Sequence, residues 1–237
     1  MASNTTHPGV LHRISRPSSN DLAPPLVAFE HGITSQSQND NTLIFLGGLS
    51  DGLLTVPFVP PIVEALPSSW RLVEPILSSA YHQWGFASLG QDIVEIAVLV
   101  EYFRTLRKGK IVLLGHSTGS QQIMHYLLSL PPSPKIDGAT MQGSISDREA
   151  MVAELAPSIY SSTCALAQTL VDEGRGSDIL PATATVSMFM SAPVSANRWL
   201  SLASPDHAGE DDYFSSDLPD ETLERTFGFI GIGKQDN

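Results

Sequence analysis

The sequence predicts an α/β fold in which a largely parallel β-sheet is flanked by helices, and three observations lead to this prediction. Short aliphatic runs that end in glycine or polar residues alternate with longer segments of helical periodicity. Residues 43–46 are apolar at every position, which is typical of a strand covered on both faces. Residues 111–114 run directly into a glycine-bounded turn and then a helical pattern, the order of elements that builds parallel sheets.

The N-terminal part of the chain predicts a loose arm followed by two strands. Residues 1–25 contain four prolines among Ser, Asn and Thr, a composition that buries too little apolar surface to offset the entropy of ordering it. Residues 26–29 are an apolar run, and the polar residues 34–41 separate this run from a strand at 42–46. Gly47 and Gly48 end that strand. We therefore expect a flexible arm over residues 1–25 and the first core strands after it.

The middle of the chain predicts the remainder of a core that spans residues 26–147. Residues 53–66 have helical spacing, but three prolines confine regular helix to the later part of this segment. Further strands are predicted at residues 70–75, 111–114 and 136–141, and a helical pattern follows residue 119. The clearest helix spans residues 92–106, with one apolar stripe formed by Ile93, Ile96, Ala97, Val100, Phe103 and Leu106.

Residues 148–228 differ in character from the core. They contain helical stretches at 149–155 and 163–171, a break rich in glycine and aspartate at 172–178, and an acidic segment at 210–212. This pattern favours a helical lid inserted over the sheet. Residues 229–232 have the pattern of a strand, and the sequence ends five residues later. We therefore expect residues 229–237 to be a truncated tail and the last strands of the sheet to be missing.

The composition disfavours several classes of protein. The 237 residues are 42% hydrophobic, enough to bury one sizeable core. Thirteen basic and 25 acidic residues give a net charge of −12, which disfavours binding to nucleic acid or to an anionic membrane surface. The one cysteine, Cys164, permits no internal disulfide and no thiolate metal cluster. The seven histidines are scattered and no cluster has ligand spacing, so no metal is expected. No other cofactor is expected either.

The sequence contains no visible targeting signal. The N-terminus has no apolar stretch of the length that a signal peptide needs. The apolar window at residues 93–100 contains Glu95 and is far shorter than the roughly 20 residues that span a bilayer. The last residues match neither a peroxisomal nor an endoplasmic-reticulum retrieval signal. We therefore expect a cytoplasmic protein, and the sequence leaves its oligomeric state open.

The pattern Gly115-x-Ser117-x-Gly119 is the candidate catalytic motif. Between a strand and a helix, this pattern predicts a sharp turn that lifts the serine hydroxyl above the sheet, with glycines where side chains would collide. Such a serine needs two backbone N–H groups to stabilise an oxyanion. Thr118 would supply the first, and the loop that begins at Gly47-Gly48, directly after the strand at 42–46, would supply the second.

The general base and the acid are harder to assign. In this arrangement the acid and then the histidine follow the serine in the chain. His125 lies eight residues along the same helix as Ser117, about 12 Å away at the helical rise, and is too far to reach it. His207, in the acidic segment, remains the candidate base, although an exposed loop histidine is the alternative. Asp147 is the candidate acid, with a helix-capping role as its alternative.

Six stretches of the chain form a specific combination: residues 9–13 (GVLHR), 47–53 (GGLSDGL), 77–81 (LSSAY) with 84–85 (WG), 115–119 (GHSTG), 142–149 (QGSISDRE) and 211–218 (DDYFSSDL). Together they resemble a mostly fungal family of uncharacterised α/β-hydrolases that includes siderophore esterases and hydrolases of host-selective-toxin clusters. The resemblance implies an α/β-hydrolase fold with Ser117 as the nucleophile. It also implies Thr118 with Gly48 or Leu49 as oxyanion donors, and residues 148–228 as a substrate-shaping lid.

The function implied by this resemblance is that of a serine esterase. The expected substrate is a small ester metabolite in fungal secondary metabolism, either in toxin biosynthesis or in siderophore hydrolysis. Members of the family continue past the region of residues 226–228 into two further strands that carry a late acid and the triad histidine. The alternative reading is therefore a catalytically impaired or truncated relative that binds a metabolite without turnover.

Overall fold

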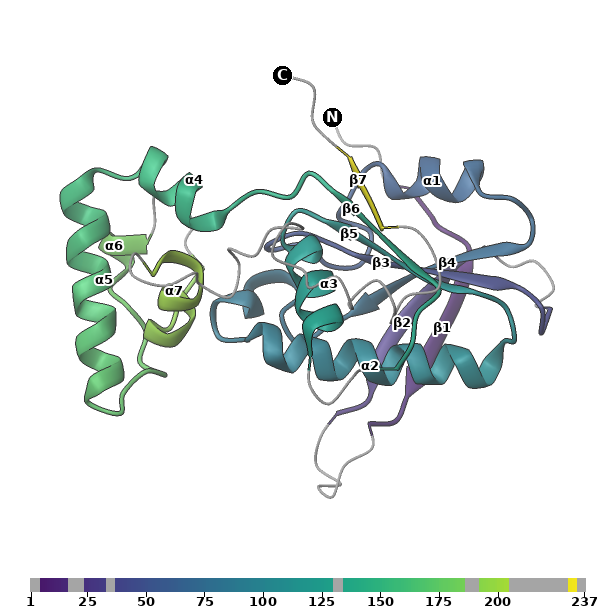
Figure 1. Ribbon diagram of the computed structural model, residues 1–237, viewed down its shortest axis with the longest axis horizontal. Coiled ribbons are helices and arrows are strands. Elements are labelled where there is room, and N and C mark those ends of the chain that lie inside the picture. The colour runs from purple at the N-terminus through teal and green to yellow at the C-terminus, as the bar shows by residue number, and fades with distance from the viewer. Residues whose placement is uncertain are drawn as a thin grey trace.

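A seven-stranded β-sheet forms the centre of the described chain. The computed structural model describes residues 5–16, 24–32, 37–129, 134–185, 192–204 and 230–233. The strand order is β1-β2-β4-β3-β5-β6-β7, with antiparallel pairing of β1 with β2 and of β2 with β4, and parallel pairing from β4 to β7 (Figure 1). The strands are β1 (Gly9–Ile14), β2 (Leu26–His31), β3 (Asn41–Leu46), β4 (Trp70–Ile76), β5 (Ile111–His116), β6 (Gly138–Gln142) and β7 (Ile230–Gly233).

Helices cover both faces of this sheet, as the apolar run at 43–46 predicts. Ile44 and Leu46 of β3 pack with α2 and α3 in one core, whereas Leu43 and Phe45 face a second core beneath α1. The helical elements are α1 (Val59–Ala65), the 3₁₀ helix η1 (Tyr81–Gly85), α2 (Leu89–Leu106), α3 (Thr118–Leu128), α4 (Asp147–Glu154), α5 (Pro157–Asp172), α6 (Ala182–Thr185) and α7 (Ala196–Ala203).

The structure contains a helix in each of the two segments, 92–106 and 53–66, whose apolar residues have helical spacing. Helix α2 buries Ile93, Ile96, Val100 and Phe103 against the sheet, and its first turn is capped by Ser88, whose hydroxyl accepts the N–H of Gln91. Helix α1 starts only at Val59, so that the two prolines after it lie in the first turn, where no intrahelical N–H bond is needed. The α/β class and the largely parallel sheet are therefore confirmed.

The structure differs from the predicted loose arm at residues 9–14, which form β1. This strand pairs with β2 in register from Gly9 opposite His31 to Ile14 opposite Leu26. Gly9 is needed there because a Cβ at that position would lie 2.2 Å from the ring of Phe29. The prediction averaged composition over 25 residues, and the six that pair with a neighbouring strand did not stand out in that average.

A buried ionic cluster joins β1 and β2 to the end of α2. Glu30 accepts hydrogen bonds from Arg107 and, at 3.0 Å, pairs with the ring of His12, whose other nitrogen contacts the hydroxyl of Tyr102 at 2.9 Å. Burial alone would raise the pKa of Glu30, but the bonds from His12 and Arg107 outweigh it, so the pKa lies below its ordinary value. Paired charges can therefore be buried under the sheet edge.

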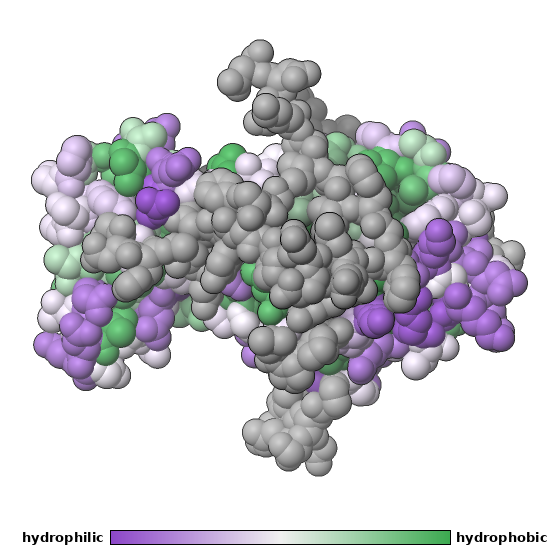
Figure 2. Space-filling view, in the orientation of Figure 1, coloured by the Kyte–Doolittle hydropathy of each residue, from purple (hydrophilic) through white to green (hydrophobic). Residues whose placement is uncertain are grey.

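Helices α4 to α7 form a separate helical unit at one end of the sheet (Figure 1). Their buried residues, among them Met151, Cys164, Leu170, Trp199 and Leu202, make a hydrophobic cluster of their own. Figure 2 shows hydrophilic and hydrophobic residues mixed over this unit's visible face. These helices fall within the predicted lid, residues 148–228, of which 205–228 lie outside the described residues. A lid role for the unit stays a prediction.

Two further segment predictions bear on the ends of the sheet. The strand pattern at residues 229–232 corresponds to β7, which pairs in parallel with β6. The expected truncation of residues 229–237 stays a prediction.

Among the helices in the described ranges, none combines the length and the apolar character needed to cross a membrane.

Candidate active site

Ser117 occupies the sharp turn between β5 and α3. Its backbone angles, φ 52° and ψ −122°, lie in a region that residues with a Cβ rarely adopt. The turn is held by the N–H of Ser117, which donates to the carbonyl of Gln142 at 3.0 Å, and by the N–H of Ser120, which donates to the carbonyl of Ser117 at 2.8 Å. The strained, half-buried serine therefore has the backbone geometry that the Gly115-x-Ser117-x-Gly119 pattern predicts.

The two glycines of the motif are required by close backbone packing. A Cβ on Gly119 would lie 2.2 Å from the carbonyl oxygen of Leu46, at the end of β3. A Cβ on Gly115 would lie 2.5 Å from the carbonyl oxygen of Gly119. Because backbone atoms cannot move aside as the end of a side chain can, these contacts hold the start of α3 against β5 and β3. The elbow is thus built by local geometry and by contact with a neighbouring strand.

The loop after β3, residues 47–55, here called the glycine loop, lies directly against Ser117. A Cβ on Gly48 would be 3.0 Å from the Cβ of Ser117 and 3.5 Å from its Oγ. The loop also concentrates backbone strain: among the described non-glycine residues, positive φ angles occur only at Ser50 (68°), Leu54 (62°), Tyr81 (57°) and Ser117. Strain of this kind gathers at functional sites, where the surrounding structure holds it in place.

The predicted oxyanion donors differ in whether their N–H groups already form a hydrogen bond. The N–H of Gly48 donates to Asp51 Oδ2 at 2.8 Å and is therefore committed to the loop itself. Thr118 is the first residue of α3, where a backbone N–H has no partner within the helix. The N–H groups of Thr118 and Leu49 form no hydrogen bond with any described residue. Thr118 and Leu49 therefore remain the candidate pair.

In the described part of the chain, no histidine ring forms a hydrogen bond with the hydroxyl of Ser117. His116, which adjoins Ser117 in sequence, contacts the amide oxygen of Gln142 at 2.5 Å and packs edge-on against Phe58. His125 is in the last turn of α3, at the end opposite Ser117. The candidate base, His207, lies outside the described residues. The Oγ of Ser117 forms no hydrogen bond within the described ranges.

Asp147 is placed in the first turn of α4, but it is not the cap. The N-cap is Ser146, whose hydroxyl accepts the N–H of Glu149 at 3.0 Å. The sequence-based alternative for Asp147 is therefore one residue out of register, although a carboxylate in the first turn also favours the helix. The role of Asp147 as the acid stays a prediction.

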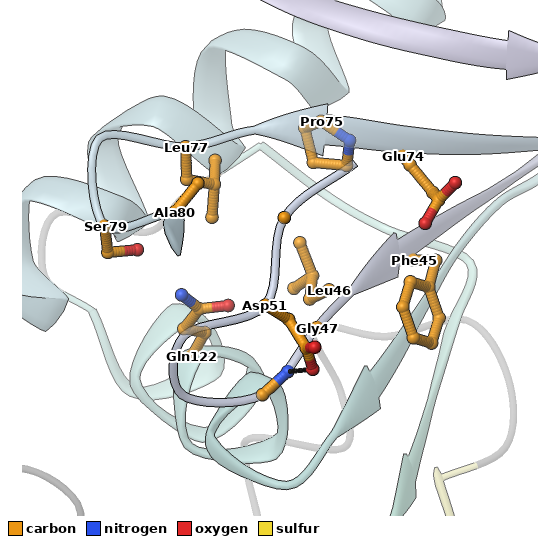
Figure 3. Close-up of a pocket in the computed structure, with 12 residues that line it drawn as sticks. Phe45, Leu46, Gly47, Asp51, Glu74, Pro75, Leu77, Ser79, Ala80 and Gln122 are labelled. Carbon is orange, nitrogen blue, oxygen red and sulfur yellow. Dashed lines mark hydrogen bonds between the residues drawn. The ribbon is translucent and has the colours of Figure 1, made fainter. Parts of the chain in front are cut away.

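A small cavity of about 40 Å³ lies beside the glycine loop (Figure 3). Gln122 of α3 lines it together with Ser79, which follows β4. The Nε2 of Gln122 donates to Asp92 at 2.8 Å, while its Oε1 is buried and has no partner among the described residues. Burial raises the pKa of Asp92 to about 6. A cavity of this size holds one or two water molecules and is too small for an ester metabolite.

Two functional features were not identified by sequence reasoning. Asp51 is not a candidate site residue in the sequence analysis, yet its side chain accepts the N–H of Gly48 and holds the glycine loop. Tyr81 supports the same loop, because its hydroxyl accepts the N–H of Leu53 at 3.0 Å. The only available signal was the GGLSDGL stretch, in which an aspartate follows a glycine pair by three residues. Within the described ranges, no group of three or more His, Cys, Asp and Glu residues is arranged to hold a metal ion.

Comparison with known proteins gives a consistent result. The family described as "Protein of unknown function (DUF1749)" matches residues 1–233. An esterase of Emericella nidulans is 37% identical over 94% of this chain and 70% of the esterase. The fusarinine C esterase sidJ of Aspergillus fumigatus is 36% identical over 94% of this chain and 72% of that protein.

Solved structures place the same fold on this chain. The siderophore hydrolase EstB from Aspergillus fumigatus superposes with a TM-score of 0.74 at 32% identity, over 96% of this chain and 77% of the hydrolase. A soluble variant of monoglyceride lipase from Saccharomyces cerevisiae gives a TM-score of 0.57 at 11% identity, over 93% of this chain and 76% of the lipase, and supports the fold alone. The predicted α/β-hydrolase fold is confirmed.

Proposed function

The chain belongs to the family described as "Protein of unknown function (DUF1749)", and on this basis we propose that it is a serine esterase that hydrolyses a small ester metabolite. The comparisons confirm the predicted class, a carboxylic-ester hydrolase of the α/β-hydrolase fold. The observation that carries the serine mechanism is the strained Ser117 elbow, with Gly48 of the glycine loop packed against it. That arrangement places the serine hydroxyl against the glycine loop, which contains Leu49, one of the two candidate N–H donors.

The proposed reaction proceeds through an acyl-enzyme. The Oγ of Ser117 attacks the ester carbonyl carbon, its proton passes to the base, and the N–H groups of Thr118 and Leu49 stabilise the negative charge on the carbonyl oxygen. The bond to the alcohol breaks as the alcohol takes up that proton. Water then attacks the acyl-enzyme, releasing the acid and restoring Ser117. We retain His207 as the proposed base and Asp147 as the proposed acid.

The proposed substrate is a siderophore-type ester, in preference to a toxin intermediate. The names of two similar proteins, fusarinine C esterase and siderophore hydrolase, favour this choice. The net charge of −12 argues against nucleic acid and anionic membrane surfaces as partners. A cytoplasmic location is proposed on the sequence features alone, and no cofactor is proposed.

The serine assignment is tested with short p-nitrophenyl esters and a fluorophosphonate probe. We expect wild-type protein to hydrolyse the esters and to be labelled at Ser117, and Ser117→Ala to lose both properties. Ser129→Ala, at the other end of α3, removes a hydroxyl that donates to the carbonyl of Tyr126 at 2.9 Å and serves as the matched control. Labelling that persists in Ser117→Ala at the wild-type rate would exclude this serine as the nucleophile.

One observation favours a second candidate, a relative that binds a metabolite without turnover. Within the described ranges no imidazole contacts Ser117 Oγ, and a serine without a base is a weak nucleophile. His207→Ala separates the two candidates. A large loss of ester hydrolysis in that variant supports the esterase with His207 as base. An inactive wild-type protein that still binds an ester siderophore in calorimetry supports the second candidate.

A further inference from the structure

Asp51 forms hydrogen bonds with the peptide groups on both sides of the Gly48 α-carbon. Its carboxylate Oδ2 accepts the N–H of Gly48 at 2.8 Å, a bond drawn as a dashed line in Figure 3. Its own backbone N–H donates to the carbonyl oxygen of Gly48 at 3.0 Å. Both peptide groups that flank Gly48 are therefore tied to one residue, and neither can rotate without breaking a hydrogen bond.

These two hydrogen bonds fix the direction of the N–H group of Leu49, the next residue in the chain. In a trans peptide the C=O of one residue and the N–H of the following residue point in opposite directions. Because the Gly48 carbonyl points toward Asp51, the N–H of Leu49 must point away from Asp51. The α-carbon of Gly48 faces Ser117, since a Cβ there would be 3.0 Å from the Cβ of Ser117. The orientation of the Leu49 N–H beside the nucleophile thus depends on Asp51.

Other contacts keep the Asp51 carboxylate itself in one orientation. Thr55 donates its hydroxyl to Asp51 Oδ1 at 2.9 Å, so that each carboxylate oxygen has its own partner. The N–H of Tyr81 donates to the Asp51 carbonyl at 2.9 Å. The side chain of Leu49 packs against the hydrophobic cluster of the helical unit. The loop is therefore held by the contact of Thr55 with the Asp51 carboxylate, by the bond from the Tyr81 N–H to the Asp51 carbonyl, and by the packing of Leu49. The first two of these contacts involve Asp51.

We propose that Asp51 is a positioning residue that holds the Gly48–Leu49 peptide group so that the Leu49 N–H meets the oxyanion formed at Ser117. This inference rests on the proposed esterase function and deepens it. Asp51 does not touch the substrate and transfers no proton. It acts by fixing a donor before the reaction starts, which favours the transition state over the bound substrate.

The test compares Asp51→Ala and Asp51→Asn with the same changes at Asp40. Asp40 precedes β3 as Asp51 follows it, and its carboxylate also accepts a loop N–H, that of Ser37 at 3.1 Å, together with Arg71. With a p-nitrophenyl ester we expect Asp51→Ala to lower kcat about 100-fold with KM changed less than about 2-fold. Asp51→Asn keeps an acceptor oxygen and should restore kcat to within about 5-fold of wild type. The Asp40 variants should leave kcat unchanged.

The affinity for phenylboronic acid gives a second readout that does not require turnover. Its tetrahedral adduct with Ser117 carries a negative charge at boron and a boron-bound oxygen in the place of the oxyanion, so Asp51→Ala should weaken the binding of phenylboronic acid by a factor similar to the loss of kcat/KM. Thr55→Val, which keeps Asp51 and removes one of its anchors, should lower kcat several-fold and serves if Asp51→Ala does not fold.

Three results would overturn the positioning role: an increase in KM alone, equal losses in Asp51→Ala and Asp40→Ala, or an Asp51→Asn variant as inactive as Asp51→Ala. Failure of the proposed function is distinct from these. It would be seen as wild-type protein inert to both reagents, or as Ser117→Ala with wild-type activity.

Discussion

Replacing Ser117 by glycine should remove the proposed activity and stabilise the fold at the same time. The backbone angles of Ser117, φ 52° and ψ −122°, are the mirror image of an extended conformation that glycine adopts readily and that a Cβ disfavours. Strain of this kind costs about 1–3 kcal/mol. Glycine also lowers the stability by about 0.5–1 kcal/mol, because it loses more conformational freedom on folding than serine does. The free energy of unfolding should therefore rise by up to about 2.5 kcal/mol in Ser117→Gly.

Ser117→Ala provides the matched comparison, because both variants lose the hydroxyl and only glycine loses the Cβ. The hydroxyl forms no hydrogen bond with a described residue, so Ser117→Ala should stay within about 0.5 kcal/mol of wild type. Urea unfolding of the three proteins at one pH measures the difference as a shift in midpoint at constant slope. A Ser117→Gly protein no more stable than Ser117→Ala would refute the idea that the elbow stores backbone strain.

Three further predictions concern the packing and the buried charges. Gly119→Ala places a methyl group 2.2 Å from the carbonyl of Leu46 and should cost about 2 kcal/mol or more in urea unfolding, whereas Gly90→Ala, whose Cβ meets nothing closer than 3.8 Å, should be neutral or stabilising. Burial raises the pKa of Asp92 to about 6 from its ordinary value of 3.8, so the wild-type protein loses stability as the pH rises through this range. In urea unfolding, Asp92→Asn should be roughly 1–3 kcal/mol more stable than wild type at pH 8, and this difference should vanish near pH 3. The pKa of Glu30 is lowered, so its stabilising effect is present above pH 4.5 and is lost as pH falls through the folded pKa; Glu30→Gln should cost about 3 kcal/mol at pH 7, and an equal cost at pH 3 would contradict this account.

Local patterns in the sequence were sufficient for the elements that surround the nucleophile. Consecutive apolar residues indicated β3 and β5 because strands buried on both faces need apolar side chains at every position. The elbow followed from Gly115, Ser117 and Gly119, since their spacing states the steric requirement of one turn. The prolines before and within the first turn of α1 confined that helix to the later part of residues 53–66 for a similarly local reason.

Features that depend on partners far along the chain escaped sequence reasoning. Residues 9–14 became a strand because β2 offers them a ladder of backbone bonds, and nothing in their own composition announces that neighbour. The helix cap was missed for a different, local reason: the side chain that accepts the N–H of Glu149 is that of Ser146, one residue before Asp147.

The sequence by itself determined that this chain is an α/β-hydrolase with a serine elbow, because both the strand pattern and the Gly-x-Ser-x-Gly turn are local requirements. Only the tertiary structure decided which N–H groups remain available to an oxyanion. The sequence offers Gly48 and Leu49 equally as the second oxyanion donor. In the structure the N–H of Gly48 is bonded to Asp51, and the N–H of Leu49 points away from Asp51. The physical reason is that a hydrogen bond commits a donor only once folding has brought its acceptor within 3 Å.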